Sequence, residues 1–215
     1  MNALTNAFTA LTGALNRVKR NDTPETIPMP TSDITVRVLQ ELVSHEAIVL
    51  EAYRDSVGIW TWGVGVTDAS GHRVGRYKNN PQTVGHTLRI FAWLVEQKYA
   101  PPVRKAFKGR NLTEAQFAAA LSFHYNTGAI GRASWVRHWL AGDIARAKTA
   151  FMEWRNPPEI IPRRAKERDL FFDGKWTSDG MATVYGVRKP SYTPDWSSAR
   201  RVDISHDLAR AIGGA

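Results

Sequence analysis

One segment most constrains how this chain can fold, residues 57–67, VGIWTWGVGVT, because it has a strand pattern within a mostly helical sequence. Trp60, Trp62 and the valines that follow alternate with small residues, which is the period of a β-strand. Gly63 and Gly65 fall in the opposite register and leave one face bare, which suits close approach by another element or a ligand. With a further strand expected after the Ser70–Gly71 turn, the segment predicts a small antiparallel sheet.

The segments around this sheet carry helical signals. Ser32 or Asp33 can cap a helix through about residue 51, with Ile34, Val38, Leu39 and Leu42 on one stripe. From residue 83 onward helices are expected, the first stopping at Pro101 and Pro102. Others are marked by a capping box of Thr113 with Gln116, a cap at Asp143 after Gly142, and a last helix over about 163–173 before Gly174. The sequence predicts an α+β, mostly helical protein with a small sheet lobe, a larger helical lobe and a cleft between them.

Three regions are expected along the 215 residues. Residues 1–32 are interpreted as an N-terminal arm with a proline-containing linker. Leu4, Phe8, Leu11 and Leu15 lie there at helical spacing, so the arm is either loosely ordered or an amphipathic helix. Residues 33–177 are the expected catalytic domain. Residues 178–215 are expected to form an extended tail, because the pattern decays after Trp176.

Charge and composition narrow the function. The chain has no cysteine, so disulfides, Cys-based zinc sites and a cysteine nucleophile are excluded. Six histidines form no H-x-x-x-H pair, so neither a metal site nor any cofactor is expected. Residues 99–215 hold 19 Lys and Arg against 11 Asp and Glu, which predicts attraction to polyanions. Nucleic acid and an anionic envelope surface, with its lipopolysaccharide, wall polymers or membrane phosphates, all qualify, and charge alone does not choose among them. A specific nucleic-acid partner is not expected, because no helix-turn-helix signature, zinc motif or basic-aromatic repeat is present.

Glu46, Asp55 and Thr61 are the candidate reaction centre. A helix end, a turn and a strand can bring these three side chains around one cleft. Glycoside hydrolysis needs a protonated carboxyl that gives its proton to the leaving oxygen and an ionised carboxylate across the sugar. Glu46, followed by Ala47 and Ile48, has the more apolar setting. From spacing alone, a solvated helix-end charge and a turn residue remain the simpler interpretation of the two acids.

The segment E-A-I-V-L-E-A-Y-R-D-S-V-G-I-W-T-W-G-V-G-V-T, residues 46–67, resembles the signature of phage-type lysozymes, glycoside hydrolase family 24. Two later segments agree in order: 122–128, SFHYNTG, resembles the segment facing the substrate cleft, and 163–176 resembles the closing helix of T-even phage lysozyme. The likeness covers roughly residues 33–177. The sequence departs from the pattern at Ala47, where Gly is usual, and at Val66, where His is usual.

The resemblance implies a lysozyme-like fold and hydrolysis of the bond between N-acetylmuramic acid and N-acetylglucosamine in peptidoglycan, as in an endolysin or lysozyme that lyses the cell wall. Glu46 would be the general acid, and Asp55 and Thr61 would hold the attacking water, with inversion. It further implies supporting roles for Tyr53 and for Arg164, whose position matches an arginine that pairs with the acid. A cation favours the ionised carboxyl, so that arginine would orient the acid rather than protonate it.

Four further residues are candidate substrate contacts. They are His124, Tyr125, Asn126 and Trp60, with at most one of Trp60 and Trp62 expected in the cleft as a sugar platform. For His124 a partly buried structural role is an alternative, and for Asn126 a loop-tying role is favoured.

Two other activities stay open: a binding protein on this fold without turnover, and a lytic transglycosylase, which needs no held water. With no signal peptide or membrane-spanning run in the sequence, an enzyme of this kind is expected in the host cytoplasm until a holin releases it, or carried among virion proteins.

Overall fold

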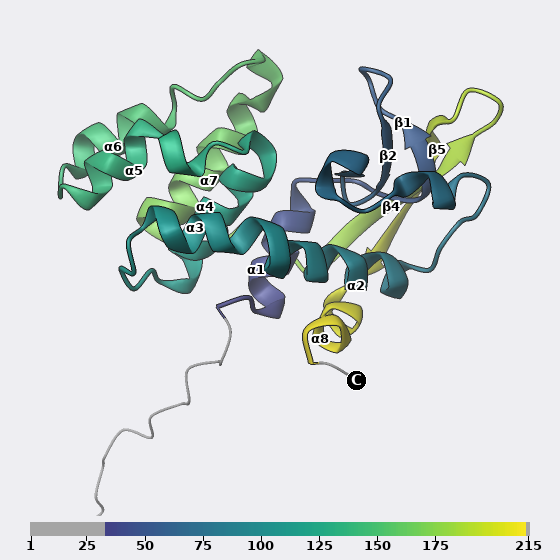
Figure 1. Ribbon diagram of the computed structural model, residues 1–215, viewed down its shortest axis with the longest axis horizontal. Coiled ribbons are helices and arrows are strands. Elements are labelled where there is room, and N and C mark those ends of the chain that lie inside the picture. The colour runs from purple at the N-terminus through teal and green to yellow at the C-terminus, as the bar shows by residue number, and fades with distance from the viewer. Residues whose placement is uncertain (1–32, 214–215) are drawn as a thin grey trace, which may run out of the picture. The chain divides into compact units, whose positions relative to one another are not determined.

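The computed structural model describes residues 33–213 as a sheet lobe and a helical lobe with α1 between them (Figure 1). The predicted N-terminal arm, 1–32, lies outside the described residues. The α-helices are α1 (Val36–Ser44), α2 (Val84–Leu94), α3 (Ala100–Ala106), α4 (Glu114–Thr127), α5 (Ser134–Leu140), α6 (Ile144–Phe151), α7 (Ile161–Asp173) and α8 (Ser205–Gly213). The strands are β1 (Ile48–Arg54), β2 (Trp60–Gly63), β3 (Val66–Thr67), β4 (Met181–Arg188) and β5 (Thr193–Asp203). The α+β, mostly helical prediction is confirmed.

The sheet is larger than predicted, with five strands in the order β3-β2-β1-β4-β5. It is mixed rather than antiparallel, because β1 and β4 run parallel while the other neighbours are antiparallel. The first helix ends at Ser44, so the prediction that it continues to about residue 51 was wrong. The expected strand beyond Gly71 was also wrong, since a 3₁₀ turn, Val74–Tyr77, occupies that place.

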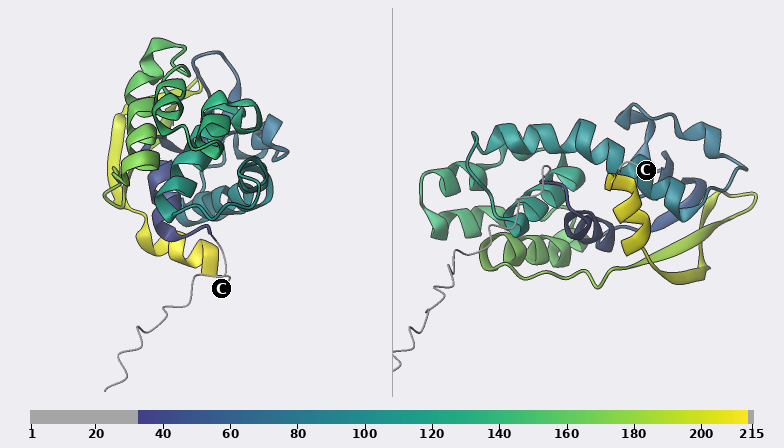
Figure 2. Two further views of the ribbon diagram at one scale, coloured as in Figure 1. Left: turned by 90° about the vertical axis from the view of Figure 1, so that its left-hand side faces the viewer. Right: turned by 90° about the horizontal axis from the view of Figure 1, so that it is seen from below.

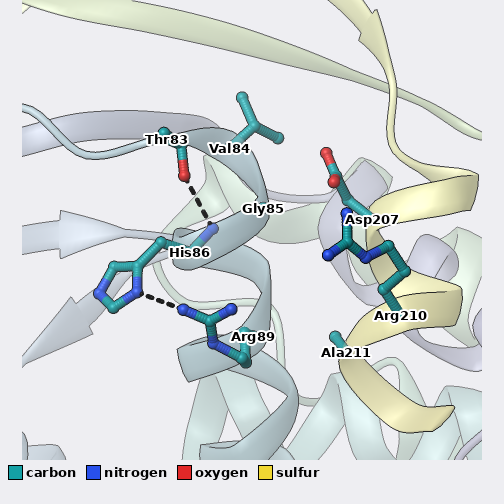
Figure 3. A pocket seen from close by; sticks show the side chains of 8 residues that line it. All are labelled: Thr83, Val84, Gly85, His86, Arg89, Asp207, Arg210 and Ala211. Carbon is teal, nitrogen blue, oxygen red and sulfur yellow. Dashed lines mark hydrogen bonds between the residues drawn. The ribbon is translucent and has the colours of Figure 1, made fainter. Parts of the chain in front are cut away.

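The described part of the predicted tail, residues 178–213, is not extended, because it forms β4, β5 and α8. β4 hydrogen-bonds to β1, and α8 packs on α1 and α2 through the buried side chain of Leu208 (Figure 2). At the start of α2, Gly85 lies against α8, so a Cβ there would be 2.9 Å from Asp207 Oδ1 and the Asp207 side chain would have to shift. Arg89 and Arg210 line a pocket between these two helices (Figure 3).

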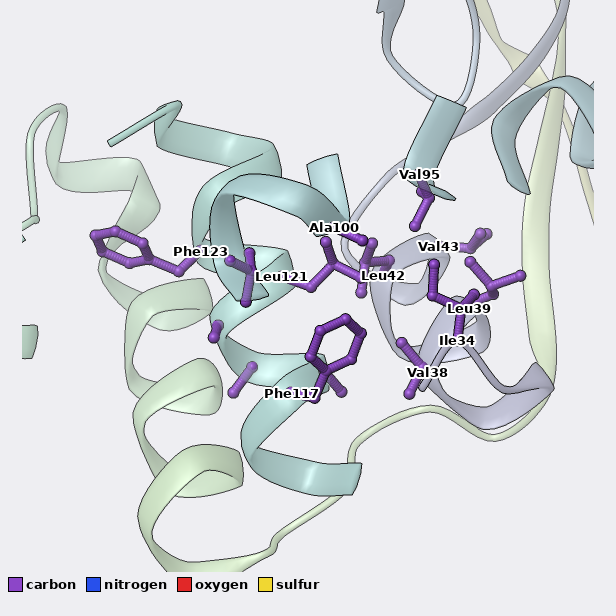
Figure 4. Packing of buried hydrophobic residues seen from close by; sticks show 14 of the residues in the cluster. Ile34, Val38, Leu39, Leu42, Val43, Val95, Ala100, Phe117, Leu121 and Phe123 are labelled. Carbon is purple, nitrogen blue, oxygen red and sulfur yellow. The ribbon is translucent and has the colours of Figure 1, made fainter. Parts of the chain in front are cut away.

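The hydrophobic core joins α1 to the helical lobe. The predicted stripe of α1 is fully buried and meets Phe117 and Leu121 of α4 (Figure 4). The capping box of Thr113 is present with both of its hydrogen bonds, as predicted. The prediction that the helical run stops at Pro101 and Pro102 was wrong. A π-helical turn over Val95–Tyr99 precedes α3, and Pro101 lies in the first turn of α3. A proline is tolerated there because the N–H groups of a first helical turn have no partner within the helix. Within residues 33–213 no helix is long and apolar enough to cross a membrane.

Glu41, a buried acid on α1, fixes this helix to the chain that follows α7. Its carboxylate accepts hydrogen bonds from the backbone N–H groups of Thr177 and Ser178, at 3.0 and 2.9 Å, and from the Thr177 hydroxyl at 2.7 Å. His45 Nε2 lies 3.5 Å away. Burial raises the pKa of Glu41, but the hydrogen bonds from these groups outweigh it and hold the pKa at about 2, below the ordinary 4.5.

This lowered pKa predicts a specific acid sensitivity. The contribution of Glu41 to stability is fully present above pH 4.5 and is lost as the pH falls towards 2. A shift of this size corresponds to roughly 3 kcal/mol of unfolding free energy. Urea unfolding between pH 7 and pH 2.5 should therefore show a smaller loss for Glu41→Gln than for the wild type. Equal losses in the two proteins would contradict this assignment.

Candidate active site

Glu46 lies directly after α1 and is contacted by both lobes. Its backbone N–H donates to the Val43 carbonyl at 2.9 Å, which continues the helix end and fixes where the side chain begins. From the helical lobe, Arg163 Nη1 on α7 donates to Oε1 at 2.6 Å. From the sheet lobe, Gly65 lies so close that a Cβ there would be 3.5 Å from Oε2. The side chain is 23% exposed, so the carboxyl group is partly accessible although Arg163 binds its Oε1.

Gly65 has a φ of +68°, in the left-handed region that favours glycine. Gly63, at +63°, meets Thr87 of α2, where a Cβ would be only 2.8 Å from Cγ2. The two glycines turn the chain between β2 and β3. The expected close approach is confirmed at Gly63, which admits α2, whereas Gly65 is favoured by its positive φ because a Cβ there would make only ordinary contact with the acid.

Asp55 is held rigidly at the turn between β1 and β2. Its Oδ1 accepts hydrogen bonds from the backbone N–H groups of Val57 and Ile59, at 3.0 and 2.8 Å. Its Oδ2 faces the hydroxyl of Thr61 at 3.5 Å, the outer limit of a hydrogen bond. The Thr61 hydroxyl donates instead to the Ile59 carbonyl at 3.2 Å. The carboxylate and the hydroxyl therefore lie together, each with capacity to bind a further group such as a water.

Tyr53 stands beside the same groups. It is the direct partner of Thr61 in the β1–β2 ladder, so both side chains lie on one face of the sheet. Burial, and then the negative charges of Glu46 and Asp55, raise the pKa of Tyr53 to about 12. The phenol therefore stays protonated at neutral pH and lies within the electrostatic reach of both carboxylates.

Tyr125 links α4 to the β2–β3 turn. Its hydroxyl donates to the Val64 carbonyl, and its ring lies against Gly65. Burial raises the pKa of Tyr125 well above its usual value, and Glu46 adds to that. Tyr99, which the sequence did not single out, has its ring centroid 4.5 Å from that of Tyr125, and burial followed by Glu46 also raises its pKa.

The arginine that pairs with Glu46 is Arg163, so the prediction of Arg164 was wrong by one residue. Arg164 points the other way on α7, is 1% exposed, and binds Glu167 and the Trp154 carbonyl. It is not a surface residue either. Adjacent positions on a helix differ in direction by about 100°, and the sequence gives no fixed phase for α7. Glu167 gives no signal for either arginine, because it pairs with Arg163 at i,i+4 and with Arg164 at i,i+3.

The other predicted substrate contacts, His124, Asn126 and Trp60, differ in their surroundings. His124 is buried, its pKa is lowered by that burial, and its Nδ1 has no hydrogen-bond partner among residues 33–213. Asn126 accepts a hydrogen bond from Arg164 at 2.7 Å, so it joins α4 to α7 and does not tie a loop as was favoured. Trp60 and Trp62 share one face of β2, opposite Thr61, because side chains alternate along a strand. The structure therefore does not bring Trp60 together with the candidate catalytic residues.

The described residues 33–213 contain no group of three or more His, Asp or Glu side chains able to hold a metal ion. The carboxylates at this site are bound instead by backbone N–H groups and by arginine. The chemistry that such an arrangement supports is proton transfer and water activation by two carboxyl groups.

Solved structures resemble this chain over nearly their whole length. The endolysin from Escherichia coli O157:H7 phage FAHEc1 has a TM-score of 0.60 and 24% identity over 68% of this chain and 99% of its own. A P22 lysozyme variant has a TM-score of 0.51 and 26% identity over 64% of this chain and 97% of its own. The muramidase domain of SpmX from Asticaccaulis excentricus has 0.50 and 25% over 65% and 97%. Among curated proteins, none matches.

The family model described as phage lysozyme matches residues 43–167, more than half of the chain. This range begins just before Glu46, contains β1 to β3, and ends within α7, so it covers every group of the site above. The chain therefore belongs to the phage lysozyme family, and it is a muramidase that hydrolyses peptidoglycan.

Proposed function

We propose that this muramidase cleaves the β-1,4 bond between N-acetylmuramic acid and N-acetylglucosamine with Glu46 as general acid and a water held by Asp55 and Thr61. One observation carries the proposal. Asp55 is locked by two backbone N–H groups through Oδ1, while its Oδ2 and the Thr61 hydroxyl face each other at 3.5 Å. This geometry suits a carboxylate that orients a water with a hydroxyl beside it.

The proton comes from Glu46 in this scheme. Arg163 binds Oε1, so Oε2, on the Gly65 side, is the oxygen that carries the proton to the leaving glycosidic oxygen. The glycosidic bond breaks, the water oxygen bonds to the anomeric carbon, and the water proton passes to Asp55. Attack from the opposite face of the sugar inverts the anomeric centre. Tyr53 stays neutral through the cycle and orients the carboxylates.

A lytic transglycosylase on the same fold would close the sugar on itself and would need no held water. The Asp55–Thr61 pair favours hydrolysis over that reaction. It equally favours an enzyme over a protein that only binds the wall, since a binding role gives no reason to fix a carboxylate next to a hydroxyl.

The products provide the test. Peptidoglycan digested by the wild type should yield muropeptides with free reducing ends, visible by mass spectrometry. Proton NMR at early times should show the α anomer first. Anhydro-sugar products, or the β anomer first, would refute the water-holding role, and no new reducing ends at all would leave only a binding function. Heat-denatured protein provides the blank.

The route to the wall is a separate part of the proposal. Residues 99–215 carry most of the excess positive charge, which supports attraction to anionic envelope polymers at low salt. We propose delivery either through a holin or with virion proteins, as for an endolysin or a virion-borne lysin.

A further inference from the structure

The turn between β4 and β5 lies against the turn that carries Asp55. The family match ends at residue 167, so this hairpin is outside it. The backbone N–H of Arg54, the residue before Asp55, donates to the carbonyl of Tyr192 at 2.6 Å. Tyr192 has a φ of +58°, uncommon for a residue other than glycine.

Aromatic and cationic side chains join the two turns. The Tyr192 ring meets Trp60 of β2 edge-on, with centroids 5.4 Å apart. Lys78 Nζ lies 4.8 Å from the Tyr192 centroid and 5.2 Å from that of Trp60. The Arg54 guanidinium covers Trp60 at 4.6 Å. Tyr192 and Trp60 thus share Lys78, and Arg54 contacts both the ring of Trp60 and the backbone of Tyr192.

Hydrogen bonds extend the contact to the 78–80 segment. The Tyr192 hydroxyl donates to Asn79 Oδ1 at 2.9 Å, and Lys189 Nζ donates to the same oxygen at 2.8 Å. Lys189 also pairs with Glu51 of β1, whose carboxylate accepts the Asn79 N–H at 2.6 Å. Glu51 is 9% exposed, so the turn is attached to the buried part of β1.

These contacts support the hairpin of β1 and β2, whose turn carries Asp55. β1 pairs with β4 only at Ile48 and Val49, far from Arg54. A two-stranded hairpin is marginally stable on its own. The outer edge of β1 near Asp55 would therefore be unsupported without the Tyr192 carbonyl and ring.

We infer that the β4–β5 turn, residues 189–192, is a positioning element for Asp55 and that Tyr192 is its positioning residue. The inference rests on the proposed role of Asp55. Tyr192 does not reach the substrate; it acts by fixing Arg54, and thereby the direction of the Asp55 carboxylate.

Kinetics on soluble peptidoglycan strands test this inference. Tyr192→Asn removes the ring but suits the left-handed backbone, so the turn can keep its path. We expect its kcat to fall about tenfold or more with KM within twofold, because small misplacements of a catalytic group are costly. Amide hydrogen exchange at Arg54 should become faster. Tyr192→Phe, which keeps the ring, should retain at least half of the wild-type kcat.

Trp196→Ala is the matched control. Trp196 is an aromatic residue of the same hairpin, 63% exposed and stacked edge-on with Tyr185, away from the Asp55 turn. Its kcat should equal that of the wild type. All rates are normalised to the folded fraction from near-UV circular dichroism, so a variant that partly unfolds is still informative.

Wild-type kcat in Tyr192→Asn, or an equal loss in Trp196→Ala or Tyr192→Phe, would overturn the inference. Asp55→Asn in the same assay separates the two levels of the argument. If Asp55→Asn keeps wild-type kcat, the proposed role of Asp55 fails. If Asp55→Asn is inactive while Tyr192→Asn is not impaired, only the positioning role fails.

Discussion

Glu46→Gln is expected to lower kcat on peptidoglycan by about 10³-fold, because general acid catalysis contributes on the order of 10²–10⁴. The amide keeps the shape of the side chain and can still accept the hydrogen bond from Arg163 Nη1. What is lost is the proton that the leaving oxygen needs. The release of reducing ends from purified peptidoglycan measures the effect.

The matched control for this substitution is Glu96→Gln. Glu96 is also a glutamate paired with an arginine, since Arg104 Nη1 lies 3.1 Å from its Oε1. It stands on the helical run after α2, and its activity should equal that of the wild type. A Glu46→Gln protein that keeps more than about a tenth of wild-type kcat would remove Glu46 from the mechanism, since loss of the acid should cost at least 10²-fold.

The sequence could locate this residue because the information is local. Glu46 follows a short amphipathic helix whose stripe is evident, and Thr61 lies within a strand of four residues. The neighbouring glycines show by their spacing where the backbone must allow close approach. Residue types, order and turn chemistry were sufficient for these features.

The errors came from long-range pairing. Ile48, Val49 and Leu50 form an apolar run that suits a buried helix or a buried strand equally well. What decides for a strand is β4, whose Val184 lies opposite Ile48 from 136 positions further along the chain. Residues 178–215 were taken for a tail because Pro190, Pro194 and scattered polar residues obscure the β4–β5 hairpin, whose strands pair with each other as well as with β1.

Side-chain direction on α7 was the second kind of information that the sequence lacked. Both Arg163 and Arg164 could have met the acid, and only the packing of α7 on α4 chooses between them. That packing sends Arg163 to Glu46 and Ser122, and sends Arg164 into the core against the Phe123 ring at 4.7 Å. Glu167 lies between the two arginines and binds both.

This arrangement predicts a large loss of stability on substitution of Glu167. Glu167 is fully buried, accepts the Ser122 hydroxyl at 2.6 Å, and is the carboxylate that neutralises Arg164, itself 1% exposed. Removing one partner of a buried ion pair leaves an uncompensated charge in a low dielectric and costs roughly 3–5 kcal/mol. Glu167→Ala should therefore lower the free energy of unfolding by about that amount, measured by urea titration with far-UV circular dichroism.

Asp169→Ala, two residues along the same helix, is the control, because it removes a carboxylate from an ion pair that is not buried. Asp169 pairs with Arg168 at 2.7 Å, but both side chains are about a third exposed, so its loss should cost less than about 1 kcal/mol. Glu167→Gln keeps the volume and the bond from Ser122 while removing the charge, so it should fall between the two. If Glu167→Ala were as mild as Asp169→Ala, Arg164 would be stabilised by the Trp154 carbonyl and Asn126 alone. Arg164 would then be held by neutral oxygens, and the Glu167 carboxylate would add little to the packing of α7 beneath Arg163 and Glu46.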